Sequence, residues 1–335
     1  MELAQIWFAV LVFLFAGYFV LEGFDFGVGA WLPWLGGNDQ ERQQLIATIG
    51  PFWDGNEVWL ITAGAVMFAA FPGFYAAIFS SLYLPFFLLL LLLILRGVAF
   101  EFRGQLSSPS WRRFWDWALF AGSAGTAFLW GIAMANWIRG IPLATGGVFV
   151  GSLLDLLSPY TFLGGLAALL LMMLQGGTFL LLRTHGQVYE KSRRATLWIG
   201  AAASAAVLIF VLASYFASDI FAGRGVNPGV IPLLAGVAML SVRALIDGHQ
   251  DRAAFAMSSL TVILSVVTVF TGMYPNLVLS SSDPTATLTI SQAVAGEGSL
   301  RVLSWVGLSL LPVVLAYEAW SFWVFRERVG EGAGY

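Results

Sequence analysis

Residues 5–34 read QIWFAVLVFLFAGYFVLEGFDFGVGAWLPW, a stretch longer than the roughly 20 apolar residues that a membrane-spanning helix needs. Two carboxylates, Glu22 and Asp25, lie deep inside this stretch, and a second apolar stretch holds Asp54 and Glu57 in the same way. One carboxylate at the centre of a membrane helix costs roughly 2.5–3.5 kcal/mol on insertion scales. These four side chains therefore need partners, protons or water, and they are the first candidates for function.

The composition indicates an all-α, polytopic membrane protein. The chain is 59% hydrophobic and 10% charged, whereas soluble domains carry about 25% charged residues. No basic tract suited to nucleic acid is present. Cys is absent, and the two histidines, His185 and His249, fall in short polar loops. We therefore expect this chain to bind no metal and to ligate no haem itself, because haem b needs axial His or Met ligands inside the membrane.

The length that a membrane span requires predicts about nine helices. No linker separates soluble domains, so residues 1–335 form one integral-membrane unit. Pro33 is expected to end or bend the first helix, while Gly27 and Gly29 favour close packing against other helices. The predicted spans are 5–34, 45–71, 75–96, 114–138, 159–183, 195–218, 230–246, 254–273 and 301–325.

The distribution of basic residues predicts the orientation. Of the 16 Lys and Arg residues, all but Arg139, Arg224 and Arg301 fall at loops or span ends on one side. Cytoplasmic loops carry the excess of Lys and Arg. The N-terminus is therefore expected outside and the C-terminus in the cytoplasm, with an odd number of spans.

The first two spans are expected to form a hairpin around the turn 36–42. The pairs 25/54 and 22/57 share one midpoint, so an antiparallel hairpin puts Asp25 level with Asp54 and Glu22 level with Glu57. Within each helix the two carboxylates are three residues apart and share a face. Because like charges that close cannot all ionise, such a cluster favours bound protons and suits a proton relay.

Four other residues are expected to support this cluster. Trp53, Asn56 and Trp59 offer neutral hydrogen-bond donors from the second span. Arg96, at the end of the third span, either snorkels to the interface or offsets one of the negative charges. The simpler alternative is that all these polar groups only hold the helices together, but four carboxylates in adjacent spans are expensive for that role.

The sequence resembles subunit II of the cytochrome bd-type quinol oxidases. The resemblance is carried by EGFDFGVG (22–29), GPFWDGNEVWLITAG (50–64), RGVAFEFR (96–103), Tyr274-Pro and the Ser-rich stretch before ATLT (286–289). It runs from the first span to the last, and its most specific word is WDGN. Glu57 stands where some members have Gln, which adds a charge beside Asp54.

This resemblance implies a fold of two four-helix bundles plus one peripheral helix, here 1–138, 159–273 and 301–325. It implies a bacterial plasma membrane complex in which a larger subunit I carries two b haems and haem d, oxidises quinol and reduces oxygen to water. Subunit II then lacks haem ligands and catalytic residues. Many members also carry a small single-helix subunit, and some bind a quinone or lipid in subunit II.

The resemblance also implies residue roles. The aspartate of the WDGN word, Asp54 here, belongs to a proton pathway at the subunit interface. Asp25 and Arg96 match polar family positions near it. Two alternatives remain open: a proton-coupled secondary transporter that uses the carboxylate cluster as its substrate site, and a scaffold with no transport role. Paired broken helices in two matching halves would favour the transporter.

Overall fold

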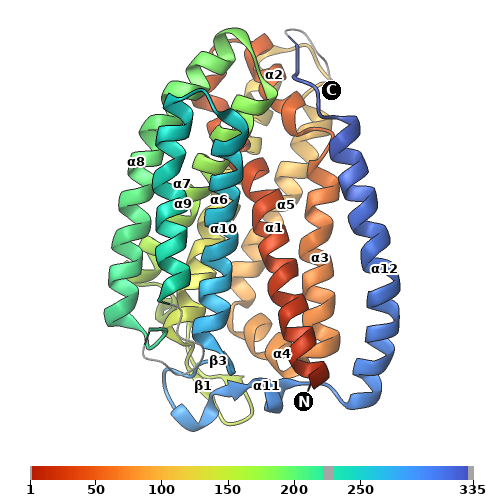
Figure 1. The fold of residues 1–335 in the computed structure, drawn as a ribbon, viewed down its shortest axis with the longest axis vertical. Helices are drawn as coiled ribbons and strands as arrows, with labels where there is room; N and C mark the ends of the chain where they lie inside the picture. Colours follow the sequence, from red (N-terminus) through yellow and green to blue (C-terminus); the bar gives the residue numbers. More distant parts are fainter. Residues whose placement is uncertain (1, 222–228, 331–335) are drawn as a thin grey trace.

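The computed structural model describes residues 2–221 and 229–330, and Arg224 of the orientation argument lies outside these ranges. The described chain is an all-α bundle of long helices that run along one common direction (Figure 1). Eight of its helices are long and apolar enough to cross a membrane, so this is a multi-pass membrane protein. The helices are α1 (Glu2–Leu35), α2 (Asp39–Ile49), α3 (Trp53–Ala70), α4 (Pro72–Ser81), α5 (Tyr83–Phe102), α6 (Pro109–Arg139), α7 (Pro159–Arg183), α8 (Gly186–Ala217), α9 (Val230–Asp247), α10 (Asp251–Met273), α11 (Ile290–Ala293) and α12 (Glu297–Val324).

Helix α1 lies at the centre of the bundle and packs against α3, α6, α7 and α10. Its close contacts with α6 and α7 require glycine, as the sequence predicts. A Cβ atom on Gly27 would collide with the backbone of α7 at Gly176, and one on Gly29 would collide with Ser123 of α6. Contrary to one expectation, Pro33 does not end α1, which continues to Leu35.

The second predicted span, 45–71, is two helices instead of one. Helix α2 ends at Ile49, residues 50–52 form a turn, and α3 begins at Trp53. Pro51 in this turn has no backbone N–H to continue the helical ladder. The third predicted span, 75–96, is likewise divided, because α4 ends at Ser81 and α5 continues to Phe102, six residues beyond Arg96.

Helix α2 is fixed at its end of the bundle by ion pairs. Arg103 contacts Asp39 at 2.7 Å and Asp116 at 2.6 Å, while Arg112 contacts the other oxygen of Asp39 at 2.5 Å. Partial burial opposes ionisation of Asp39, but the hydrogen bonds and charges of the two arginines outweigh it and lower its pKa. This network fixes the direction from which the chain enters α3.

The opposite end of the bundle carries two small antiparallel ribbons. Strand β1 (Leu143–Ala144) pairs with β2 (Val148–Phe149), and β3 (Asn276–Val278) pairs with β4 (Leu288–Thr289). A bridge between Ile141 and Ser280 joins the two loops. Two short 3-10 helices complete these loops, η1 (Leu153–Leu156) and η2 (Pro284–Ala286).

Helix α12 stands at the edge of the bundle beside α3 (Figure 1). It begins at the end where α1 begins and finishes at the opposite end, near α2 (Figure 1). Very few of its side chains are buried, and Leu300 is one that is. Its apolar surface is therefore free to face lipid or another protein.

Candidate functional site

Three of the four predicted carboxylates converge on Arg96. Its guanidinium Nη1 lies 3.0 Å from Glu22 Oε2 and 3.5 Å from Glu57 Oε1, and its Nη2 lies 3.7 Å from Asp25 Oδ2. Arg96, Glu22 and Asp25 are fully buried, whereas the Glu57 side chain is 24% exposed. Of the two alternatives for Arg96, the structure therefore favours charge compensation over snorkelling, because α5 carries it well inside the bundle.

The aromatic rings of two helices cover the guanidinium. Its carbon lies 4.9 Å from the ring centre of Phe26 on α1 and 5.5 Å from that of Phe100 on α5. A Cβ on Gly122 of α6 would collide with the Cβ of Arg96 and with the Leu92 carbonyl oxygen, so glycine lets α6 close the site from a third side. The cation is held in place by packing as well as by charge.

Besides Arg96, the predicted supporting residue Asn56 also reaches a carboxylate. Its Nδ2 donates a hydrogen bond of 2.7 Å to Asp25 Oδ2. Trp53 and Trp59 do not contribute in the expected way, because neither indole N–H has a hydrogen-bond partner in the described structure. Trp53 instead stacks on Phe100, with ring centres 5.0 Å apart.

Asp54 does not join the buried ion pairs. It lies in the first turn of α3 and is exposed, so the predicted convergence of four carboxylates is wrong for this residue. Asp54 remains on the same helix as Glu57, three residues before it, so the two side chains are neighbours on the surface of α3. The four carboxylates thus form a graded series from exposed Asp54, through half-buried Glu57, to buried Glu22 and Asp25.

A fifth carboxylate, Glu318 of α12, lies close to this series. Its Oε2 is 3.7 Å from the position that a Cβ on Gly55 would occupy, and the side chain is half-buried. The sequence signal for Glu318 is weak, because it is a single acid in the last apolar stretch with no recognisable word around it. Its position could be found only from the packing of α12 against α3.

Several buried polar atoms of the cluster have no hydrogen-bond partner among the described residues. Oε1 of Glu22, Oδ1 of Asp25 and Nε of Arg96 have neither a hydrogen bond nor an ion pair within the described residues. Three carboxyl groups also face one guanidinium. In a low-dielectric interior such an excess of acidic groups favours bound protons, and the unsatisfied atoms can accept hydrogen bonds from water.

No arrangement in the described ranges suits a metal ion. Groups of three or more His, Cys, Asp or Glu side chains with metal-binding geometry are not found there. His185 and His249 are both exposed at helix ends. Within the described residues the site is an acid cluster around one cation, Arg96.

The chain is similar to known proteins over nearly its full length. The family model described as cytochrome bd terminal oxidase subunit II matches residues 3–325. The chain is 38% identical to cytochrome bd ubiquinol oxidase subunit 2 of Bacillus subtilis strain 168, over 98% of this chain and 97% of that protein. It is 33% identical to cytochrome bd-I ubiquinol oxidase subunit 2 of Escherichia coli K12, over 97% and 94%.

A solved structure gives the same fold. A chain of the bd oxidase from Geobacillus thermodenitrificans superposes with a TM-score of 0.79 at 17% identity, covering 97% of this chain and 99% of that one. The matching stretch includes the carboxylate words of α1 and α3, from which the buried cluster is built. The chain belongs to the family of cytochrome bd terminal oxidase subunit II.

Proposed function

We propose that this chain is the haem-free subunit of a quinol:oxygen oxidoreductase complex in a bacterial plasma membrane, and that its carboxylates conduct protons to the partner subunit. The relatives in Bacillus and Escherichia are named as subunits of ubiquinol oxidases. The single observation that carries the proton role is the graded series from exposed Asp54 through Glu57 to the Arg96 cluster. Electron transfer from quinol to oxygen belongs to the two b haems and haem d of subunit I.

The orientation in this proposal puts the α2 end of the bundle in the cytoplasm. Most basic residues of the described chain gather there, including Arg42, Arg103, Arg112 and Lys191 in ion pairs with acids of that end. Cytoplasmic loops are enriched in Lys and Arg. Protons from the cytoplasm would then meet the carboxylates near the start of α3, within a short distance of their aqueous source.

The division of labour among the carboxylates follows from their exposure. Asp54 lies where a partner subunit can cover it, so it is the residue that exchanges a proton with that partner. Glu57 lies between Asp54 and the buried cluster and passes a proton between them. Arg96 holds Glu22 and Asp25 in place and keeps the negative charge of the buried part low enough to be stable.

The architecture in the proposal has a first four-helix bundle within 1–138, a second within 159–273, and α12 as the ninth, peripheral span. Helix α3 is the span that falls short of the apolar content of the other eight, because its first turns carry Asp54, Asn56 and Glu57. The exposed face of α12 and the nearby start of α3 offer a surface for the haem-bearing subunit I. A small single-helix subunit fits the same proposal.

The test of the proton role is the variant Asp54→Asn in the purified complex. We expect normal haem absorbance and an oxygen-consumption rate at least about tenfold lower, because proton transfer by a placed acid contributes roughly 10²–10⁴-fold to rates that depend on it. Glu101→Gln is the matched control, because Glu101 is an exposed acid at the end of α5 outside the cluster. A normal rate with full assembly would contradict the relay.

The same purification separates this proposal from a secondary transporter. An oxidase subunit should elute from detergent with a haem-containing partner and a Soret band, whereas a transporter should elute colourless. Loss of all haem in Asp54→Asn would instead support a scaffold whose acidic residue serves assembly.

A further inference from the structure

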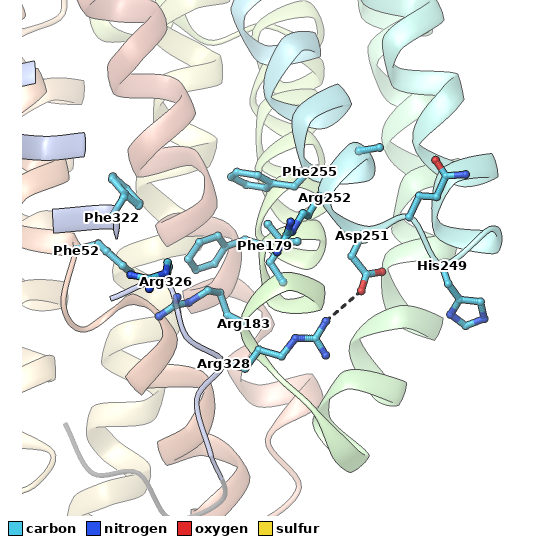
Figure 2. A pocket seen from close by; sticks show the side chains of 13 residues that line it. Phe52, Phe179, Arg183, His249, Asp251, Arg252, Phe255, Phe322, Arg326 and Arg328 are labelled. Atoms are coloured by element: carbon cyan, nitrogen blue, oxygen red, sulfur yellow. Dashed lines mark hydrogen bonds and ion pairs between the residues drawn. The ribbon is translucent and has the colours of Figure 1, made fainter. Parts of the chain in front are cut away.

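A cavity of about 850 Å³ lies at the end of the bundle where α7 ends and α10 begins. Its walls come from these two helices, from the last turn of α12 and from the turn before α3. It is separate from the Arg96 cluster, none of whose residues lines it. Figure 2 shows phenyl rings and guanidinium groups from these different segments around one volume.

One part of the wall is aromatic. Phe52 and Phe322 stack with ring centres 4.6 Å apart, and Phe179 and Phe255 meet at 5.7 Å. Phe52 and Phe179 are buried, while Phe255 and Phe322 are half-buried. This surface suits a hydrocarbon group rather than a small hydrated ion.

The other part of the wall carries a buried cation, Arg183. Its guanidinium carbon lies 5.4 Å from the ring of Phe52 and 5.9 Å from that of Phe179, and the residue is only 7% exposed. Its Nε has no hydrogen-bond partner, and no carboxylate lies within ion-pair distance of it in residues 2–221 and 229–330. A buried charge without a partner is strongly unfavourable, so this guanidinium calls for an anion.

Three more arginines face the same volume against one acid. Arg252, Arg326 and Arg328 line the cavity, and Asp251 is the acid among its lining residues. Asp251 pairs with Arg328 at 3.5 Å, which leaves the rest of the basic charge unbalanced (Figure 2). The segment after α12 closes one edge, because the Val329 N–H donates to the Arg183 carbonyl at 2.8 Å.

We propose that this cavity binds the phosphate headgroup of an anionic phospholipid, with its acyl chains leaving along the phenyl rings. Guanidinium groups bind phosphate through paired, charge-assisted hydrogen bonds. Basic pockets between helices at the cytoplasmic side of membrane proteins take anionic headgroups. Free phosphate shares the headgroup chemistry but leaves the aromatic wall unused. A zwitterionic headgroup has the phosphate but also brings a quaternary ammonium next to four arginines, which disfavours it.

Native mass spectrometry of the purified complex tests this proposal. The complex is titrated with phosphatidylglycerol, with phosphatidylcholine of the same chains, and with phosphatidylglycerol in the presence of inorganic phosphate. We expect Arg183→Gln to weaken phosphatidylglycerol binding about tenfold or more, because a hydrogen bond to a charged group accounts for roughly that ratio. Phosphatidylcholine, whose headgroup has no net charge, should bind more weakly to the wild type and lose less affinity in this variant. Arg243→Gln is the control, because Arg243 is an exposed arginine near the end of α9 that does not line the cavity.

A second variant keeps the proposal testable. If Arg183→Gln fails to assemble, as judged by haem content, exposed Arg328→Gln takes its place, with an expected loss of severalfold. Equal phosphatidylglycerol binding in the cavity variant and the control variant would overturn the proposal. A structure of the complex in which side chains of the partner subunit fill the cavity would also overturn it. Displacement of the lipid by millimolar phosphate would overturn it in favour of a free anion.

Discussion

The carboxamide of Asn56 donates a 2.7 Å hydrogen bond to Asp25, whereas Asp54, two residues earlier on α3, is exposed. Helix α3 thus presents an amide, not an acid, to the buried carboxylate of α1. The amide is also nearer to Asp25 than the guanidinium is, because Arg96 Nη2 lies 3.7 Å from the same oxygen. The pair therefore joins α1 and α3 at the depth of the buried cluster.

Replacing this amide should weaken the junction of α1 and α3. Asn56→Leu keeps a similar volume but removes the donor, and hydrogen bonds to charged groups contribute about 1.5–3 kcal/mol. We expect a lower thermal midpoint of the purified complex. A double-mutant cycle with Asp25→Leu should show that the two substitutions are less than additive. Fully additive effects would mean that the two side chains do not interact.

Removing the buried cation should destabilise the subunit more severely. Arg96→Met leaves Glu22, Asp25 and Glu57 without their ion-pair partner, and breaking a buried pair costs about 3–5 kcal/mol. We expect little assembled complex, measured as haem recovered per cell mass. The double variant Arg96→Met with Glu22→Gln removes the carboxyl closest to Arg96 and should recover part of that yield. A double variant as poor as the single one would show that packing of Arg96, not its charge, is what the site needs.

Much of the fold could be predicted from the sequence, because the membrane imposes simple rules. Apolar length located the helices, and glycine at 27 and 29 indicated close helix contacts that the structure confirms. The hairpin register was nearly right, since residues 22 and 57 both reach Arg96. The resemblance to subunit II of the bd-type oxidases is confirmed by the family match.

Other features depended on information that apolar length does not carry. The turn at 50–52 divides the second span and turns the start of α3, so that Asn56 rather than Asp54 faces Asp25. The apolar run before Arg96 predicts a helix end at this first charged residue, whereas α5 continues for six mostly apolar residues to Phe102. Arg183 gave no signal, because its unpaired state arises only when α7, α10 and α12 are brought together.

The contact between α1 and α7 should tolerate no added methyl group. Gly176→Ala would drive a Cβ into the backbone of α1 at Gly27 and Val28, and overpacking of this kind costs about 1–3 kcal/mol or more. We expect a lower thermal midpoint and less assembled complex. Gly236→Ala on α9 is the matched control, because among the described residues the added Cβ would meet no atom within 4 Å outside its own stretch of helix. That variant should be neutral or slightly more stable, since alanine is favoured over glycine in a helix by about 0.5–1 kcal/mol. Equal losses in both variants would contradict the close contact.

The ion pairs that hold α2 should make the protein sensitive to acid. Arg103 and Arg112 overcome the effect of partial burial and lower the pKa of Asp39, so Asp39 contributes stability at neutral pH, and that contribution is lost as the pH falls through the lowered pKa. Asp39→Asn should therefore be less stable than the wild type at pH 7, and the difference should shrink towards pH 3. Because the Asp39 side chain is 50% exposed, the loss at pH 7 should be about 1 kcal/mol or less.

Asp247→Asn is the control for this prediction. Asp247 is exposed to a similar extent, 53%, but its ion pairs with Arg193 and Arg243 are 3.9 and 4.0 Å long. Thermal midpoints measured across this pH range should thus differ from wild type for Asp39→Asn and follow it for Asp247→Asn. A stability gap at Asp39 that does not change with pH would assign its role to shape rather than charge.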